Sequence, residues 1–363
     1  MAHSATLLGM PAEMFDLIVK STNAADLARL RLVSRECAGK VSSTFKEEYI
    51  HDRRVKLAKE ASMVNTLKII EHPTFGAAVR HLILIDDTVA DPDDNSFAAD
   101  DVDWDAGGED VALARYNAQE SFRRNGEDRR LLTGLFAMCK QRKNLKGVCF
   151  WSFNMGGWCT DGDWRLNATK DESEWSGPTN DHSFMTVMLA LISSDASFET
   201  FEMNTERGAG IPIERYGLEY QKGVVCKTAL SQFESIDLVL CSGADDGEDH
   251  STLEFMTMMA KLKIRSLEVT ALRHLAVKEL VSFLPFENLN FPAMESLMLA
   301  QVHFTWEHLV KFVGRQKSLQ RLEVVGGMAC FPRRLRDTVL GGLSQAVSVS
   351  KVVEYDVEYY EQP

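Results

Sequence analysis

The chain has 363 residues, of which 45% are hydrophobic, and a formal net charge of −13. This length exceeds one ordinary domain and predicts two domains, or one small module followed by repeats. The acidic balance argues against nucleic acid as a partner, because a phosphate backbone would be repelled. The longest apolar run, 184–192, is too short to span a bilayer, so no membrane segment is expected.

Two short amphipathic helices are predicted near the N-terminus. Pro11 suits the first turn of a helix, where its missing N–H is no loss, and Asn23 is a candidate cap for a second helix. Apolar residues follow the helical spacing in both segments, at Met14, Leu17 and Ile18 and then at Leu27, Leu30, Val33 and Cys37. Helices this short are marginal in water. The apolar stripe therefore needs a partner or a neighbouring domain to cover it.

Residues 6–45 resemble an F-box, the helical module that joins a substrate adaptor to a cullin-based ubiquitin ligase. The family pattern is matched at Met10-Pro11, Glu13, Ile18, Leu27, Leu30-Arg31 and Val33-Ser34-Arg35. Two departures are the methionine before the proline, where the family commonly has leucine, and the lack of a tryptophan within 37–45. The resemblance implies a three-helix F-box at 1–50 that binds a Skp-family linker protein and, through it, cullin. The contacts that it implies are Met10, Pro11, Met14, Ile18, Leu27, Leu30, Val33 and Ser34. The alternative is a pair of helices that packs on its own core.

Residues 51–78 are expected to join this module to the rest of the chain. A short strand is expected at 53–57, where it would cover the open end of a sheet. The run from Lys68 to Leu82, with His72-Pro73 and Phe75-Gly76, resembles the segment that joins the F-box to the first repeat in fungal F-box proteins. His72-Pro73 also fits a helix end on physical grounds, because a residue before proline avoids the helical region.

A pattern of an apolar residue, two others, an apolar residue, one other and an apolar residue recurs through 79–363. Its last positions are Leu84, Phe150, Met203, Leu238, Val269, Leu299, Val324 and Val357. The alternation predicts strands, and helical patterns lie between them at 131–139, 184–193, 253–262, 277–284, 308–313 and 335–343. A strand and a helix repeating at about 25–35 residues are typical of a leucine-rich-repeat-like solenoid. The predicted fold class is α/β, with a parallel sheet and helices on its outer face, and the array is irregular. A doubly wound α/β enzyme is disfavoured, because no glycine-rich nucleotide-binding turn, P-loop or G-x-S-x-G motif occurs.

Two insertions, at 86–126 and 151–183, interrupt the early repeats. The segment 86–110 holds eleven acidic residues and no lysine or arginine, a composition typical of a solvated disordered loop. The second insertion contains Trp158, Trp164 and Trp175, which either bind a partner or fold over the array as a lid. Both segments carry short Asp-rich runs that lack the complete ligand set of a calcium loop. No metal and no cofactor are therefore expected.

One residue of each repeat, between its last two apolar positions, is expected to face outward on the sheet. These residues are Ile83, Cys149, Glu202, Asp237, Glu268, Met298, Glu323 and Asp356. Five of the eight are carboxylates, which suggests an acidic trough for a basic protein substrate. The alternative is that these charges only keep an exposed sheet soluble and discourage edge pairing.

Seven cysteines include no Cys-x-x-Cys pair, so reduced thiols and a cytoplasmic or nuclear location are expected. None of the nine histidines falls in a recognisable catalytic constellation. The sequence and the resemblance together predict a non-catalytic substrate-recognition adaptor of an SCF-type (Skp–cullin–F-box) ubiquitin ligase. The alternative is a repeat scaffold that uses the F-box outside ubiquitin transfer.

Overall fold

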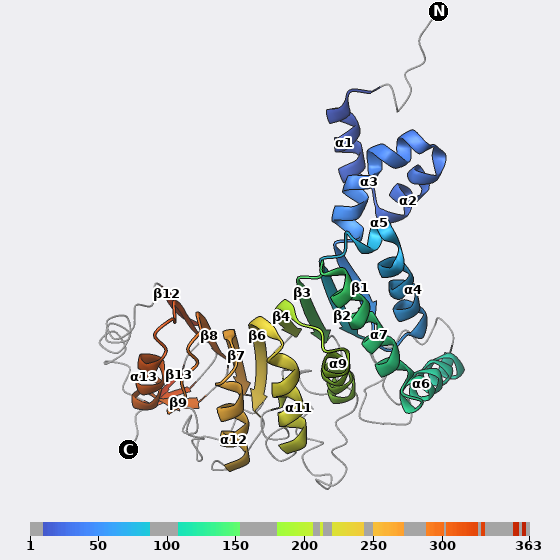
Figure 1. The fold of residues 1–363 in the computed structure, drawn as a ribbon. Coiled ribbons are helices and arrows are strands. Elements are labelled where there is room, and N and C mark those ends of the chain that lie inside the picture. Colours follow the sequence, from blue (N-terminus) through green and yellow to red (C-terminus); the bar gives the residue numbers. More distant parts are fainter. Residues whose placement is uncertain are drawn as a thin grey trace, which may run out of the picture.

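The computed structural model describes residues 10–87, 108–152, 180–205, 211–212, 220–242, 250–271, 288–300, 303–325, 328–330, 351–355 and 358–360. Three helices form a module at one end, and a long row of strands and helices follows it (Figure 1). The chain is therefore α/β, and its main sheet is open and parallel. Among the described residues, no helix is both long and apolar enough to cross a membrane.

The N-terminal module consists of α1 (Ala12–Ser21), α2 (Ala24–Val33) and α3 (Arg35–Tyr49). The side chain of Asn23 caps α2 by accepting a hydrogen bond from the Asp26 amide at 3.0 Å. Ser34 caps α3 in the same way, with the Cys37 amide 3.1 Å from its hydroxyl. The extended backbone of Ser34 separates α2 from α3. The helical spacing predicted to run from Leu27 to Cys37 is thus divided between two helices.

A short segment leads from the module into the sheet: β1 (Asp52–Lys56), α4 (Glu60–Glu71) and α5 (Pro73–Gly76). The strand expected at 53–57 is confirmed, because β1 is the first strand of the sheet and pairs with β2. His72 ends α4 and starts α5, where its Nδ1 accepts hydrogen bonds from the amides of Thr74 and Phe75 at 3.2 and 3.3 Å. Gly76 ends α5 against Ile70, so closely that a Cβ would lie 1.9 Å from the Ile70 carbonyl oxygen.

In the main sheet, most strands lie beside the strands that precede and follow them in the sequence. After β1 its order is β2 (His81–Asp86), β3 (Gly147–Ser152), β4 (Phe198–Thr205), β6 (Phe233–Ser242), β7 (Ile264–Ala271), β8 (Ser296–Ala300), β10 (Arg321–Val325) and β12 (Lys351–Tyr355). All neighbours are parallel, and β5 (Ile211–Pro212) pairs with β6 off this path. A second parallel sheet joins β9 (His303–Thr305), β11 (Met328–Cys330) and β13 (Glu358–Tyr360). We call residues 52–360 the strand–helix array.

Helices cover one face of the main sheet (Figure 1). They are α7 (Glu127–Arg142), α9 (Asn180–Ser194), α11 (Tyr220–Leu230), α12 (His250–Met259) and α13 (Trp306–Arg315), and α6 (Gly108–Arg124) packs on α7. Alternate strand residues such as Leu82, Val148 and Phe201 are buried beneath them in one continuous core. Helix α6 lies inside the expected insertion 86–126, so the C-terminal part of that insertion is a regular helix. The helices expected at 277–284 and 335–343 lie outside the described residues.

Several successive units are joined by a repeated backbone contact near the start of their strands. The carbonyl of Arg80 accepts hydrogen bonds from the amides of Lys146 and Gly147, at 2.7 and 3.3 Å, and the carbonyl of Lys146 accepts from Glu199 and Thr200 in the next unit. Two buried or half-buried amide side chains add to these contacts. Asn144 donates to the carbonyls of Gly76 and Val79 at 2.7 and 2.6 Å. Gln316 bonds the backbone of Leu289, Phe291 and Phe312 at 2.8–3.1 Å.

Candidate functional site

The N-terminal module leaves apolar side chains uncovered on its first two helices. Of the eight large hydrophobic residues that the structure exposes, five lie between residues 10 and 33: Met10, Met14, Leu17, Leu32 and Val33. We call these five the helical face. Leu17, Leu32 and Val33 are 65%, 86% and 70% exposed. Large apolar side chains that remain exposed in this way are candidate interaction residues.

The opposite side of the same helices forms the interior of the module. Phe15 and Val19 on α1 pack with Leu27 on α2 and Val41 on α3, and all four are at most 2% exposed. α1 therefore has two apolar stripes, one turned inward and one turned outward. A helix pair that only packed on its own core would not need the second stripe.

The eight residues expected to contact a linker protein do not share one environment. Met10, Pro11, Met14 and Val33 are exposed, Ile18, Leu30 and Ser34 are half-buried, and Leu27 is buried. One of these expectations needs correction, because Leu27 fills the module's own core. Ser34 is half-buried, and its hydroxyl caps α3.

Leu32, the most exposed of the helical face, was not singled out from the sequence, and Leu17 appeared only as part of the stripe. Their signal is the helical spacing itself. On α1, Leu17 lies two positions from the inward residues Phe15 and Val19, and on α2 Leu32 lies five positions after the inward Leu27, so the helical spacing turns both leucines outward.

An arginine and two aromatic rings connect the module to the strand–helix array. The Arg31 guanidinium carbon lies 4.4 Å from the ring centroid of Phe45 on α3 and 4.7 Å from that of Phe75 on α5. Phe45 packs against the interior of both the module and the array. Because a guanidinium over an aromatic face is held by the ring quadrupole, this stack ties the helical face to the first turn of the array.

The outward face of the main sheet is the second candidate surface. Register contacts run from Ile83 to Cys149, from Cys149 to Glu202 and from Glu202 to Asp237. The predicted row is thus correct over its first four members. Between β6 and β7 the register shifts, so that Asp237 lies opposite Ser266, whereas Glu268 lies opposite Val239. Glu268, Met298 and Glu323 are in register with one another. The seven predicted positions that the structure describes therefore occupy two offset rows.

The acidic trough expected on this face is largely neutralised where the structure describes it. Arg265 Nε donates to Asp237 Oδ1 at 3.1 Å, and Arg321 Nε donates to Glu323 Oε1 at 3.0 Å. Asp237 raises the pKa of Arg265 through this hydrogen bond and through its charge. Glu202 is exposed and stays available on the surface. A guanidinium group thus pairs with a carboxylate at two places on the described sheet, so its outward face carries both charges and is not uniformly acidic.

Four of the expected substrate contacts, Asp356, Trp158, Trp164 and Trp175, lie outside the described residues. The position in register with Glu323 is taken by Val353.

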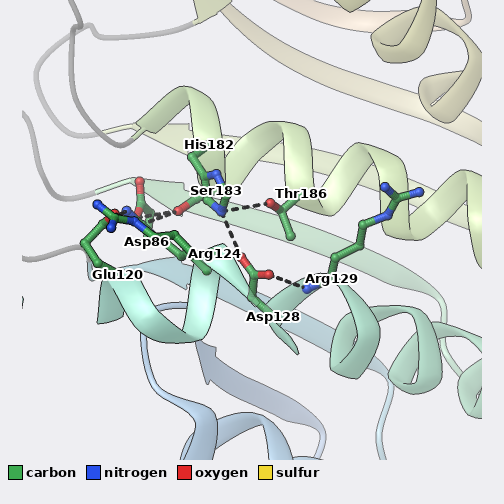
Figure 2. A network of polar contacts seen from close by, with 9 residues as sticks. Asp86, Glu120, Arg124, Asp128, Arg129, His182, Ser183 and Thr186 are labelled. Atoms are coloured by element: carbon green, nitrogen blue, oxygen red, sulfur yellow. Dashed lines mark hydrogen bonds and ion pairs between the residues drawn. The ribbon is translucent and has the colours of Figure 1, made fainter. Parts of the chain in front are cut away.

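A polar cluster lies where α6, α7 and α9 meet the end of β2 (Figure 2). Ser183 Oγ donates to Asp86 Oδ1 at 2.9 Å, and Arg123 donates to Ser183 Oγ at 3.3 Å. His182 Nε2 lies 2.8 Å from Asp128 Oδ2 and 3.3 Å from Thr186 Oγ1. The Ser183 hydroxyl is engaged by Asp86 and not by His182, so the arrangement differs from a nucleophile–histidine–carboxylate triad. The cluster fastens the start of α9 to the end of β2.

The cysteines within the described residues do not form a reactive or metal-binding group. Burial raises the pKa of the Cys139 thiol to about 12. Burial and the charge of Glu202 raise that of Cys149 to about 12 as well. Thiols with raised pKa values are poor nucleophiles. Within the described part of the chain, no cluster of three or more His, Cys, Asp or Glu residues could hold a metal ion.

Comparisons of the chain with family models, curated proteins and solved structures found no match.

Proposed function

We propose that the N-terminal module is an F-box and that the chain is the substrate-recognition adaptor of an SCF-type ubiquitin ligase. In this proposal the helical face binds a Skp-family linker protein, which in turn binds cullin. The strand–helix array, a leucine-rich-repeat-like solenoid, binds the protein to be modified. In this proposal the chain is not catalytic. It contributes proximity, because holding a target beside a ubiquitin-charged enzyme makes ubiquitin transfer effectively intramolecular.

The observation that carries the proposal is the outward apolar stripe on a module that already has a core. Met14 and Leu17 on α1 and Val33 on α2 are exposed, although Phe15, Val19 and Leu27 already fill the interior. Each large apolar side chain that becomes fully buried contributes about 1.5–3 kcal/mol of transfer free energy. Five such residues are sufficient for a stable interface once the cost of association is subtracted.

The form of the array supports the second half of the proposal. Within the described residues, successive turns of the chain add one parallel strand beside the previous strand, and neighbouring helices from α4 to α12 pack side by side. Repeats that stack in this way offer extended binding surfaces. The outward face of the sheet carries exposed and half-buried residues of both charges, which suits recognition of a protein surface.

The experiment is affinity purification of the tagged full-length chain and of a Leu17→Glu, Val33→Glu variant. We expect the wild-type chain to bring down a Skp-family linker protein and cullin, and the variant to lose both. The matched control is Leu113→Glu, because Leu113 is an exposed leucine on α6 outside the module. Circular dichroism checks that each variant is folded.

Three outcomes contradict the proposal or part of it. Retention of the linker protein by the double variant would exclude the helical face as its binding site. Equal loss by Leu113→Glu would show that the effect is not specific. Recovery of the linker protein without cullin would favour the alternative, a repeat scaffold that uses the F-box outside ubiquitin transfer.

A further inference from the structure

At the N-terminal end of the array, four side chains of different character lie side by side on the outward face. Arg54 on β1 is in register with Ile83 on β2, Ile83 with Cys149 on β3, and Cys149 with Glu202 on β4. Neighbouring strands lie about 4.8 Å apart. The row therefore runs from a cation to a carboxylate, across two uncharged residues, over about 14 Å.

The centre of this row is apolar and is extended by a tryptophan. Trp151 on β3 is in register with Ile85 on β2, one outward position further along both strands. The Arg54 guanidinium carbon lies 5.6 Å from the Trp151 ring centroid, so Arg54 reaches over the apolar centre. Ile83, Cys149 and Trp151 are half-buried and accessible, whereas Ile85 is 8% exposed and forms the floor.

The charged groups around Arg54 and around Glu202 leave the two ends of the row with opposite charges. Beside Arg54 on the outward face, Asp52 and His81 pair with each other at 2.9 Å, and Lys56 lies 3.8 Å from Asp87. Beyond Glu202, Arg265 is hydrogen-bonded to the carboxylate of Asp237, and the charge of Glu202 also contributes to the raised pKa of Arg265. The surface is therefore cationic at Arg54 and anionic at Glu202. A nucleic acid or an anionic membrane would meet repulsion at the second end.

We propose that this row binds an extended protein segment that carries one acidic and one basic residue about four positions apart, with an apolar residue between them. The acidic residue pairs with Arg54, the apolar one contacts Ile83, Cys149 and Trp151, and the basic one pairs with Glu202. The inference deepens the function proposed above, on which it rests, by naming the kind of segment that the array reads.

The test uses the full-length chain and three fluorescein-labelled peptides with the cores Asp-Ser-Leu-Ser-Lys, Asp-Ser-Leu-Ser-Asp and Lys-Ser-Leu-Ser-Lys. Fluorescence anisotropy at low ionic strength measures their binding. We expect the mixed-charge peptide to bind at least about fivefold more tightly than either like-charged peptide. This preference should weaken as salt is added, because the end contacts are exposed ion pairs.

Charge reversal makes the test specific. Arg54→Glu leaves two carboxylates in the row, so the Lys/Lys peptide should become the tightest binder. Glu202→Lys leaves two cations, so the Asp/Asp peptide should become the tightest. Lys261→Glu is the matched control, because Lys261 is an exposed residue that follows α12, and it should keep the wild-type order.

Failure of either reversal to change the preferred peptide would overturn the inference, and so would the absence of peptide binding by the wild-type chain. Binding of the linker protein is measured on the same variants and is expected to be unchanged. If the wild-type chain shows no preference for the mixed-charge peptide but still binds the linker protein, only this inference is contradicted. Loss of linker binding in Leu17→Glu, Val33→Glu tests the proposed function separately.

Discussion

Arg31 on α2 lies with its guanidinium carbon 4.7 Å from the ring centroid of Phe75 on α5. His72 stacks on the same ring, with 4.6 Å between the two centroids. The Phe75 ring is therefore shared between the N-terminal module and the segment that begins the array. Since α3 also continues into β1 through the buried residue Ile50, the two parts of the chain are joined by packing as well as by the backbone.

Arg31→Ala should weaken this junction. The change removes a guanidinium and its aliphatic stem from between Phe45 and Phe75, and we expect a loss of about 1–2 kcal/mol in the free energy of unfolding. Urea unfolding and hydrogen exchange of the amides of α1–α3 measure it. The control is Arg29→Ala, which removes only an exposed ion pair with Asp26 and should cost at most about 0.5 kcal/mol. Equal effects of the two changes would mean that the stack contributes nothing.

Gly76→Ala should be strongly destabilising. A Cβ at Gly76 would meet the Ile70 carbonyl oxygen at 1.9 Å, and backbone atoms cannot give way as a flexible side chain can. We expect a loss of at least about 2 kcal/mol. Gly39 on α3 has no atom within 4 Å of the position that a Cβ would take, so Gly39→Ala should gain about 0.5–1 kcal/mol. Thermal unfolding of both variants measures these effects. An unchanged unfolding temperature for Gly76→Ala would contradict the close approach of Gly76 to the Ile70 carbonyl.

Gln316→Leu should destabilise the C-terminal part of the array. The variant keeps an apolar side chain of similar size but leaves the Phe291 amide and two carbonyls without the Gln316 side chain. A buried group without a partner costs about 1–3 kcal/mol. Hydrogen exchange should show faster exchange at the Phe291 amide. The neighbouring exposed residue provides the control, and Lys317→Ala should change stability by no more than about 0.5 kcal/mol.

Stability should fall at alkaline pH because of buried thiols. Burial raises the pKa of Cys139 to about 12 and raises that of Cys226 further, whereas an unfolded thiol has a value of 9.0. Below pH 9 both states hold the proton. Between pH 9 and 12 the unfolded chain loses protons that the folded chain keeps, so the free energy of unfolding decreases as the pH rises.

Urea midpoints measured from pH 7 to 10 test this expectation. Cys226→Ala should have a flatter decline above pH 9 than the wild-type chain, whatever its stability at pH 7. An identical slope in the two proteins would exclude Cys226 as a source of the pH dependence.

The Cys149 thiol, with a pKa of about 12, should also react slowly with iodoacetamide at pH 8, because almost none of it is thiolate.

The strands were predictable because their apolar residues alternate. In β2, β3 and β10 the expected inward positions, such as Leu84, Phe150 and Leu322, are buried. Strand order also followed from the repetition, since a unit that cannot bury its apolar face alone packs on its neighbour in sequence. Two helix starts were predictable from single residues. Pro11 directly precedes α1, and the side chain of Asn23 caps α2.

Sequence periodicity could not predict the register between strands. It also could not predict which apolar residues of the module point inward and which point outward. The irregularity between Ile236 and Asp237 adds a residue to the pairing, and nothing in an apolar pattern marks it. It separates Glu268 from Asp237 and brings Arg265 beside Asp237. In the module, Leu27 and Val33 satisfy the same helical spacing, yet one is 1% exposed and the other 70%. Tertiary packing distinguishes them, because Leu27 packs with Phe15, Val19 and Val41 inside the module.

The carbonyls of Arg80 and Lys146 each accept a pair of hydrogen bonds from amides of the next unit along the chain. An architecture joined in this way can lengthen or shorten by duplication or deletion of whole units during evolution, without rebuilding those that remain. The N-terminal module lies at one end of the array (Figure 1), so such changes in distal units would alter the outward face of the sheet without altering the helical face.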